Sequence, residues 1–101
     1  MSMCVVELHI RPPLSYEVSK LAGGLVIQEK ISENETLGDL LTRLDAKNPT
    51  LFKKIYDSSN QEIQKFIVTV VNGITVPRSE AMARELLDGD KITWFLMYAG
   101  G

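Results

Sequence analysis

The residues of this 101-residue chain best suited to chemistry are its last two, Gly100 and Gly101. A glycine pair has no side chains, so it can enter a narrow channel and adopt backbone conformations closed to other residues. Gly101 is expected to present a free carboxylate, which is a poor acyl donor until it is activated. Adenylation by ATP would convert it to a mixed anhydride that a sulfur or amine nucleophile can attack. The alternative interpretation is a frayed terminus, where small residues also collect.

Other side chains with reactive potential are few and isolated. The single histidine, His9, falls on the polar side of an alternating run, so we interpret it as solvent-facing and not as a metal ligand. The single cysteine, Cys4, excludes an internal disulfide and a cysteine-rich zinc site, and we interpret it as a small core residue. The Lys53-Lys54 pair is interpreted as a solvated helix face. No bound metal or cofactor is expected.

The composition is that of one small globular domain, with 45% hydrophobic and 24% charged residues. A net charge of -2 lacks the basic surface typical of nucleic-acid binders. The longest apolar stretches, 66–71 and 94–99, are far shorter than the roughly 20 residues of a membrane helix. The N-terminus shows no signal-peptide pattern. Together with the lone cysteine, these features predict a cytoplasmic protein without nucleic-acid or membrane partners.

Periodicity and turn residues predict the elements that must position the glycine pair. Alternating apolar and polar residues indicate strands, and apolar residues three and four apart indicate helices. Asn72-Gly73 predicts a two-residue hairpin turn, and Asp88-Gly89-Asp90 predicts another tight turn. The segments 57–64 and 78–87 are interpreted as connections. In order, the predicted elements are a strand over 4–11, a short helical turn over 14–21 closed by Gly23-Gly24, a strand over 25–31, a long helix after Thr36, a short helix after Asn48-Pro49, and strands over 66–71, 74–76 and 91–98.

The long helix defines the architecture. Thr36 and Asp39 have the spacing of a capping box, and an apolar stripe of four leucines follows at helical spacing. The strand over 66–71 is apolar on both faces, as a central strand should be. Laying one amphipathic helix across one face of a mixed sheet buries both apolar surfaces, so the fold class is α+β.

The last strand is expected to present a docking patch. Ile92 and Trp94 share one face, which we assign to the core. Phe95 and Met97 then point to solvent beside the reactive end. Large exposed apolar groups at that place suggest a surface for a partner protein, although the 12–24 segment could instead cover them.

Three separated motifs resemble a known family. Asp88-Gly89-Asp90, the following residues 91–95 and the ending Ala99-Gly100-Gly101 are similar to the C-terminus of the MoaD/ThiS family of ubiquitin-like sulfur carriers. The match is closest to the MoaD members, which are small subunits of molybdopterin synthase. Residues 36–41 resemble the start of the family's helix. Residues 70–73 resemble its central strand and turn.

This resemblance implies a β-grasp domain over 1–98 and a flexible tail over 99–101. It implies a carrier protein and not an enzyme, with Gly101 adenylated and converted to a thiocarboxylate and Gly100 in the slim tail. An activating enzyme of the ThiF or MoeB type would use ATP for this, and a MoaE-type large subunit would take the sulfur into molybdopterin. The partner-binding residues would be Phe95, Met97, Tyr98 and Ala99.

Alternative functions stay open from the sequence. Many MoaD members have two prolines where this chain has Leu96-Met97, and the segments 12–24 and 50–64 look longer than in compact members. A ThiS-like carrier for thiamin, or a ubiquitin-related modifier for tRNA thiolation or protein conjugation, would share the same tail chemistry. A plain β-grasp interaction domain with an accidental glycine pair is the third possibility.

Overall fold

A computed structural model describes residues 4–12, 14 and 24–97 of the 101-residue chain. The predicted helical turn over 14–21 lies outside the described residues except for Leu14, which is buried. In chain order the elements are β1 (Cys4–Ile10), β2 (Leu25–Ile31), α2 (Leu37–Lys47), α3 (Pro49–Phe52), β3 (Tyr56–Asp57), β4 (Glu62–Ile63), β5 (Ile67–Val71), β6 (Ile74–Val76), α4 (Arg78–Ala81) and β7 (Lys91–Leu96).

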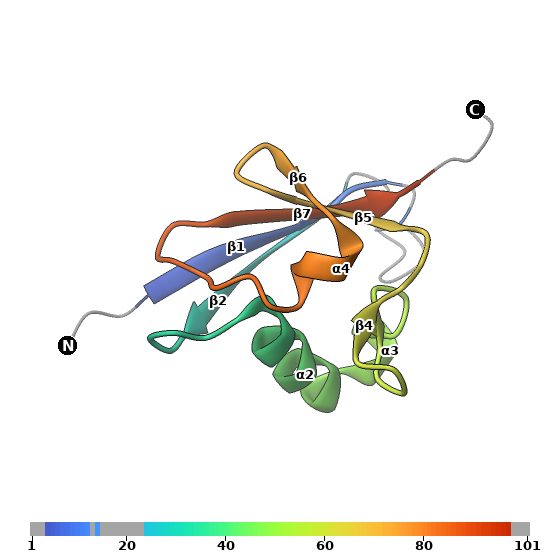
Figure 1. Ribbon diagram of the computed structural model, residues 1–101, viewed down its shortest axis with the longest axis horizontal. Coiled ribbons are helices and arrows are strands. Elements are labelled where there is room, and N and C mark those ends of the chain that lie inside the picture. The colour runs from blue at the N-terminus through green and yellow to red at the C-terminus, as the bar shows by residue number, and fades with distance from the viewer. Residues whose placement is uncertain (1–3, 13, 15–23, 98–101) are drawn as a thin grey trace.

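Five of the strands form one mixed sheet in the order β2-β1-β7-β5-β6 (Figure 1). The β1 and β7 strands run parallel, and the other neighbours are antiparallel. Asn72 and Gly73 both have positive φ, at 52° and 85°, and they close the β5–β6 hairpin as their types predict. The predicted central strand, β5, is paired on both sides, but the middle of the sheet is β7.

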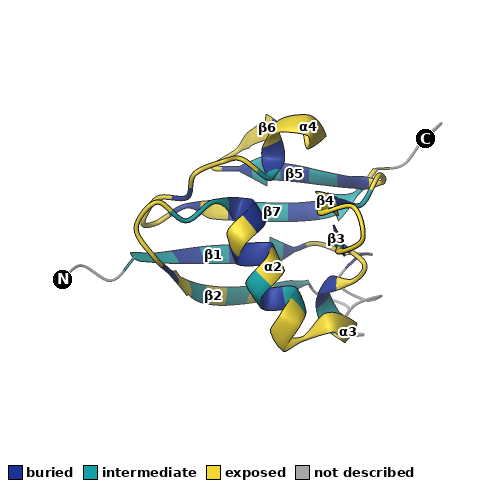
Figure 2. Cartoon of the chain, turned by 60° about the horizontal axis from the view of Figure 1, so that its bottom comes forward, coloured by how far each residue is buried: buried dark blue, intermediate teal, exposed yellow. Residues whose placement is uncertain are grey.

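One face of the sheet, called the helix face below, is covered by α2 (Figure 2). Thr36 Oγ1 accepts a hydrogen bond from the Asp39 N–H, and the Asp39 carboxylate accepts one from the Thr36 N–H, both at 3.1 Å. The predicted capping box is therefore confirmed. The buried core of the helix face includes Leu37, Leu40, Leu41 and Leu44 of α2 with Val6, Leu8, Ile10, Ile92 and Trp94 of the sheet.

The start of α2 lies close to the chain beyond α4. The Gly38 N–H donates to the Met82 carbonyl oxygen at 2.9 Å. A Cβ atom at position 38 would lie 2.8 Å from that same oxygen, which is closer than real Cβ contacts allow. The helix can dock here only because residue 38 has no side chain.

Two segments interpreted as connections contain structure. Over 56–63, which overlaps the first of these segments (57–64), β3 and β4 pair as a small hairpin whose Ile63 is fully buried. The Arg78 Nε donates a hydrogen bond to the Ile63 carbonyl oxygen at 2.7 Å. This bond connects the hairpin to a residue 15 positions later in the sequence. Within 78–87, the helix α4 buries Ala81. Strands of two residues and a helix of four carry no readable period, which is why the interpretation as plain connections was wrong.

Candidate functional site

The candidate site is the end of β7, from which the chain continues toward the glycine pair. Of the predicted site residues, Phe95 and Met97 are described. Tyr98, Ala99, Gly100 and Gly101 lie outside the described residues. The geometry on which the site can be built is therefore that of the strand ending at Leu96 and of the surfaces around it.

The start of β7 is fixed by two interlocked turns. The buried Asp90 carboxylate accepts hydrogen bonds from the Leu87 N–H at 2.9 Å and the Asn72 side-chain amide at 2.8 Å. The Asn72 amide oxygen accepts from the Lys91 N–H at 2.9 Å. The turn before β7 is thereby tied to the β5–β6 turn. Asp88-Gly89-Asp90 is a tight turn as predicted, with Gly89 at a φ of 86°.

The end of β7 is fixed by backbone pairing on both sides. The Arg11 N–H donates to the Trp94 carbonyl oxygen at 3.0 Å, and the Met97 N–H donates to the Phe66 carbonyl oxygen at 2.8 Å. Trp94 between them is fully buried on the helix face. The pairing extends through residue 97, which is the last residue that the structure describes.

The outer face of the sheet, opposite α2, carries the predicted docking patch. Met97 is 53% exposed. Phe95 lies across from Val68 on β5 and is half-buried, and the Arg11 guanidinium lies 5.8 Å from its ring centroid. A shallow hollow is lined by Arg11, Pro12, Val68, Phe95, Leu96 and Met97. Phe95 therefore offers a partner a partly covered ring with a cation beside it, and less exposed apolar area than a fully solvent-facing residue would.

Polar residues occupy the outer face further along β1. His9 Nε2 and Glu7 Oε1 are 3.0 Å apart. The hydrogen bond from His9 lowers the pKa of the Glu7 carboxyl below its usual 4.5. His9 was interpreted as a solvent-facing residue; it is half-buried and engaged with its strand neighbour. Among residues 4–12, 14 and 24–97, no three His, Cys, Asp or Glu side chains are grouped closely enough to hold a metal ion.

Sequence reasoning missed Phe66. The residue was assigned to a strand core, but it precedes β5 and its side chain is 65% exposed. Its carbonyl oxygen is the acceptor of the Met97 N–H, so this exposed aromatic lies next to the end of β7. Residue type alone gives no signal for this, because a phenylalanine beside a strand of valines and isoleucines looks like core.

The mixed five-stranded sheet with one long helix packed across it is the β-grasp fold, and the class of protein it defines here is the small ubiquitin-like protein. The chain belongs to the ThiS family, a family of ubiquitin-like sulfur carriers, whose model matches residues 17–101. The predicted fold and the family resemblance are both confirmed. Members of this family are small carrier proteins, and ubiquitin-like sulfur carriers generally interact with activating enzymes and acceptor enzymes.

Solved structures show the same architecture. SAMP1 from Haloferax volcanii superposes with a TM-score of 0.71 at 18% identity, covering 96% of this chain and 99% of that one. The Haloferax volcanii HVO 2177 protein gives 0.66 at 28% identity, covering 96% and 88%. Urm1 from Trypanosoma brucei gives 0.68 at 18% identity, covering 100% of both chains. No curated protein matches the sequence. Among the described helices, none is long and apolar enough to cross a membrane.

Proposed function

We propose that this protein carries sulfur on the carboxyl group of Gly101. In the first step an oxygen of that carboxylate attacks the α-phosphorus of ATP, and pyrophosphate leaves. In the second step hydrosulfide attacks the acyl adenylate and AMP leaves, so that one sulfur replaces one oxygen. If the nucleophile is instead the persulfide of a sulfurtransferase, AMP leaves to give an acyl disulfide, and a thiol must then cleave its S–S bond to release the thiocarboxylate. An enzyme of the ThiF or MoeB type performs the activation, and a sulfurtransferase supplies the sulfur. The carrier supplies only the carboxylate and the surface that presents it.

The observation that supports this proposal most strongly is the range of residues that the ThiS family model matches. It runs to residue 101 and so includes the glycine pair. The scaffold suits the role, because β7 is hydrogen-bonded on both sides up to Met97. The residues 97–101 can span at most about 17 Å when fully extended. A carrier of this design brings its carboxylate to a second protein while its domain stays outside the active site.

We further propose molybdopterin synthesis as the destination of the sulfur, with a MoaE-type large subunit as the acceptor enzyme. The motif 88–95 and the terminal Ala-Gly-Gly support this choice. Leu96-Met97 in place of two prolines departs from the MoaD pattern and leaves other destinations open, namely thiamin synthesis, tRNA thiolation or conjugation to proteins. Activation of Gly101 is common to all of these pathways.

Intact mass spectrometry tests the proposal directly. The purified protein is incubated with the activating enzyme, ATP and a sulfur source. Replacement of one oxygen by one sulfur at the C-terminus supports the carrier, and conjugates to lysines of other proteins support the modifier. An unchanged mass with every ThiF- or MoeB-type enzyme of the source genome contradicts both.

A variant lacking Gly101 is the matched control. It should keep the melting temperature of the parent, because the hydrophobic core lies within 4–97. It should not be adenylated. If it is still activated, Gly101 is not the reactive residue.

A further inference from the structure

A groove lies beside the end of β7, on the side of α3, and no predicted site residue belongs to it. Its most exposed member is Phe66, which is held next to residue 97 by the 2.8 Å hydrogen bond from the Met97 N–H. Ile67 and Leu96 pair across the two strands and form part of the floor. The groove therefore opens where the chain leaves the sheet.

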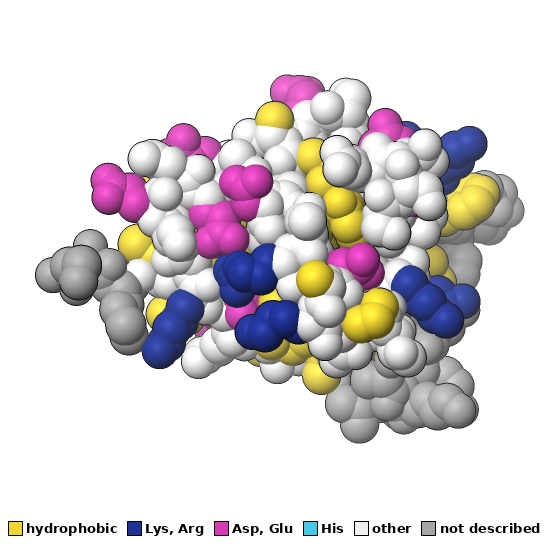
Figure 3. All heavy atoms as spheres, turned by 90° about the horizontal axis from the view of Figure 1, so that it is seen from below, with side chains coloured by type: hydrophobic (Ala, Val, Ile, Leu, Met, Phe, Trp, Pro, Cys, Tyr) yellow, Lys and Arg dark blue, Asp and Glu magenta, His cyan; other side chains and the backbone are white. Residues whose placement is uncertain are grey.

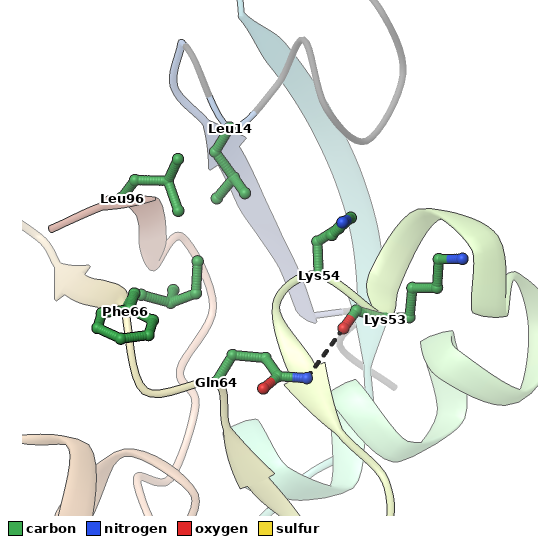
Figure 4. Close-up of a pocket in the computed structure, with 7 residues that line it drawn as sticks. Leu14, Lys53, Lys54, Gln64, Phe66 and Leu96 are labelled. Atoms are coloured by element: carbon green, nitrogen blue, oxygen red, sulfur yellow. Dashed lines mark hydrogen bonds between the residues drawn. The ribbon is translucent and has the colours of Figure 1, made fainter.

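The groove combines an apolar floor with a basic rim. Figure 4 shows Leu14, Leu96 and Phe66 on one side, with Lys53 and Lys54 on the other. Its volume of about 390 Å³ is enough for one large side chain of a partner.

The rim of the groove is held in place. The Gln64 side-chain amide donates to the Lys53 carbonyl oxygen at 3.1 Å, and the Gln64 N–H donates to the Ile55 carbonyl oxygen at 2.8 Å. Ile55 is fully buried, so these two hydrogen bonds connect the lysine-bearing turn to the core. The basic residues are thus presented from a fixed backbone.

Among the described residues, no carboxylate neutralises the positive charge of this groove. Lys53 and Lys54 are exposed, and within the described residues neither ammonium group forms an ion pair. No acidic side chain is among the described residues that line the groove. By contrast, basic and acidic side chains are interspersed on the α2 side of the molecule (Figure 3), where Arg43 contacts both Glu29 and Glu35. Two exposed lysines beside an apolar floor suit a ligand that is both apolar and anionic.

We propose that the groove binds a segment of the activating enzyme that carries a large apolar side chain flanked by carboxylates. The inference rests on the proposed function, because the enzyme that adenylates Gly101 must come within the reach of residues 97–101. Phe66 lies at the start of that reach. A nucleic acid would also bring negative charge, but the protein's net charge of -2 and the apolar floor favour a peptide.

The test measures the rate of adenylation at increasing concentrations of the carrier. The rate is monitored by ATP–pyrophosphate exchange with the ThiF- or MoeB-type enzyme of the source genome. Phe66→Ser removes the aromatic contact, and the double variant Lys53→Glu/Lys54→Glu reverses the rim charge. Each should raise KM for the carrier on the order of tenfold while kcat stays within about twofold, because the groove touches no reacting atom. Added salt should raise KM of the parent protein more than KM of the lysine variant.

Two matched variants serve as controls. Ile74→Ser removes an apolar side chain that is 71% exposed on β6, and Lys30→Glu reverses an exposed charge on β2. Both should leave KM unchanged, and melting curves should show all variants folded. If the groove variants also keep the parent KM while the parent is adenylated, the groove inference is wrong and the carrier function stands.

Two other results would also overturn the inference. If the parent protein is not adenylated at all, the inference and the proposed function fail together. If light scattering shows that the parent is a dimer and that Phe66→Ser makes it a monomer, the occupant of the groove is a second copy of this chain.

Discussion

Trp94 and Phe95 are neighbours on β7, but their side chains point to opposite faces of the sheet and differ in burial. Trp94 points to the helix face and is fully buried under α2, whereas Phe95 points to the outer face and is half-buried beside Arg11. The alternation of a strand thus separates two tasks in one element. The helix face stabilises the domain, and we propose that the outer face and the end of β7 bind partner proteins. Changes on the helix face should therefore alter stability, while changes on the outer face should alter binding.

The largest effect is expected from Trp94→Ala. Removing the largest fully buried side chain leaves a cavity between α2 and the sheet, and large-to-small changes of this kind cost about 3–5 kcal/mol. Chemical denaturation should show this loss in the free energy of unfolding. A loss under about 1 kcal/mol would contradict the assignment of β7 as the centre of the core.

Gly38→Ala should cause the next largest loss in the free energy of unfolding. The new methyl group would meet the Met82 carbonyl oxygen at 2.8 Å, and backbone has to move to relieve that contact. We expect a loss of about 1–3 kcal/mol in the free energy of unfolding, despite the better helix propensity of alanine. Gly89→Ala is an informative comparison: no atom within 4 Å opposes its Cβ, so any loss there comes from its positive φ alone.

Thr69→Val is a change on the helix face that should increase stability instead of reducing it. Thr69 is the cross-strand partner of Trp94. Within the described residues, neither the Thr69 hydroxyl nor the Trp94 indole N–H has a hydrogen-bond partner, although both are buried. Replacing the hydroxyl by a methyl group of similar size should raise the free energy of unfolding by about 1 kcal/mol. A loss of stability would mean that the hydroxyl is hydrogen-bonded in solution, for example to a buried water.

Features formed by residues close in the sequence could be predicted, whereas features formed by contacts between distant residues could not. The capping box, the apolar stripe of α2 and the Asn72-Gly73 turn are local, and all three were predicted correctly. The buried Ile63 accepts a hydrogen bond from Arg78, and Glu29 on the helix-facing side of β2 forms an ion pair with Arg43 of α2. Such pairings join distant residues, so no local pattern reports them. For the same reason the lysine-rimmed groove at Phe66 was invisible from sequence, while the role of Gly101 stays a prediction.

Phe95→Ala sharpens the comparison on the outer face. Because the ring is half-buried, its removal should cost clearly less stability than Trp94→Ala. Binding to the activating or acceptor enzyme should weaken, since a large aromatic residue beside the tail suits a protein interface. Titration calorimetry alongside melting curves separates these outcomes. A fall in melting temperature equal to that of Trp94→Ala would place Phe95 in the core and remove it from the docking surface.

The smallest effect is expected from His9→Ala, a change on the same outer face but on β1, across from Thr93. The hydrogen bond from His9 lowers the pKa of Glu7 below 4.5, so the ionised carboxylate is favoured in the folded protein. A lowered folded-state pKa contributes stability above pH 4.5, and that contribution is lost as the pH falls through the lowered value. The variant should therefore melt slightly earlier than the parent near neutral pH, and the difference should shrink in acid. Titration of the Glu7 carboxyl by NMR should show its pKa returning toward 4.5 in the variant, though not fully, because Gln28 and Lys91 also lower it. An unchanged Glu7 pKa would show that the histidine contact does not form in solution.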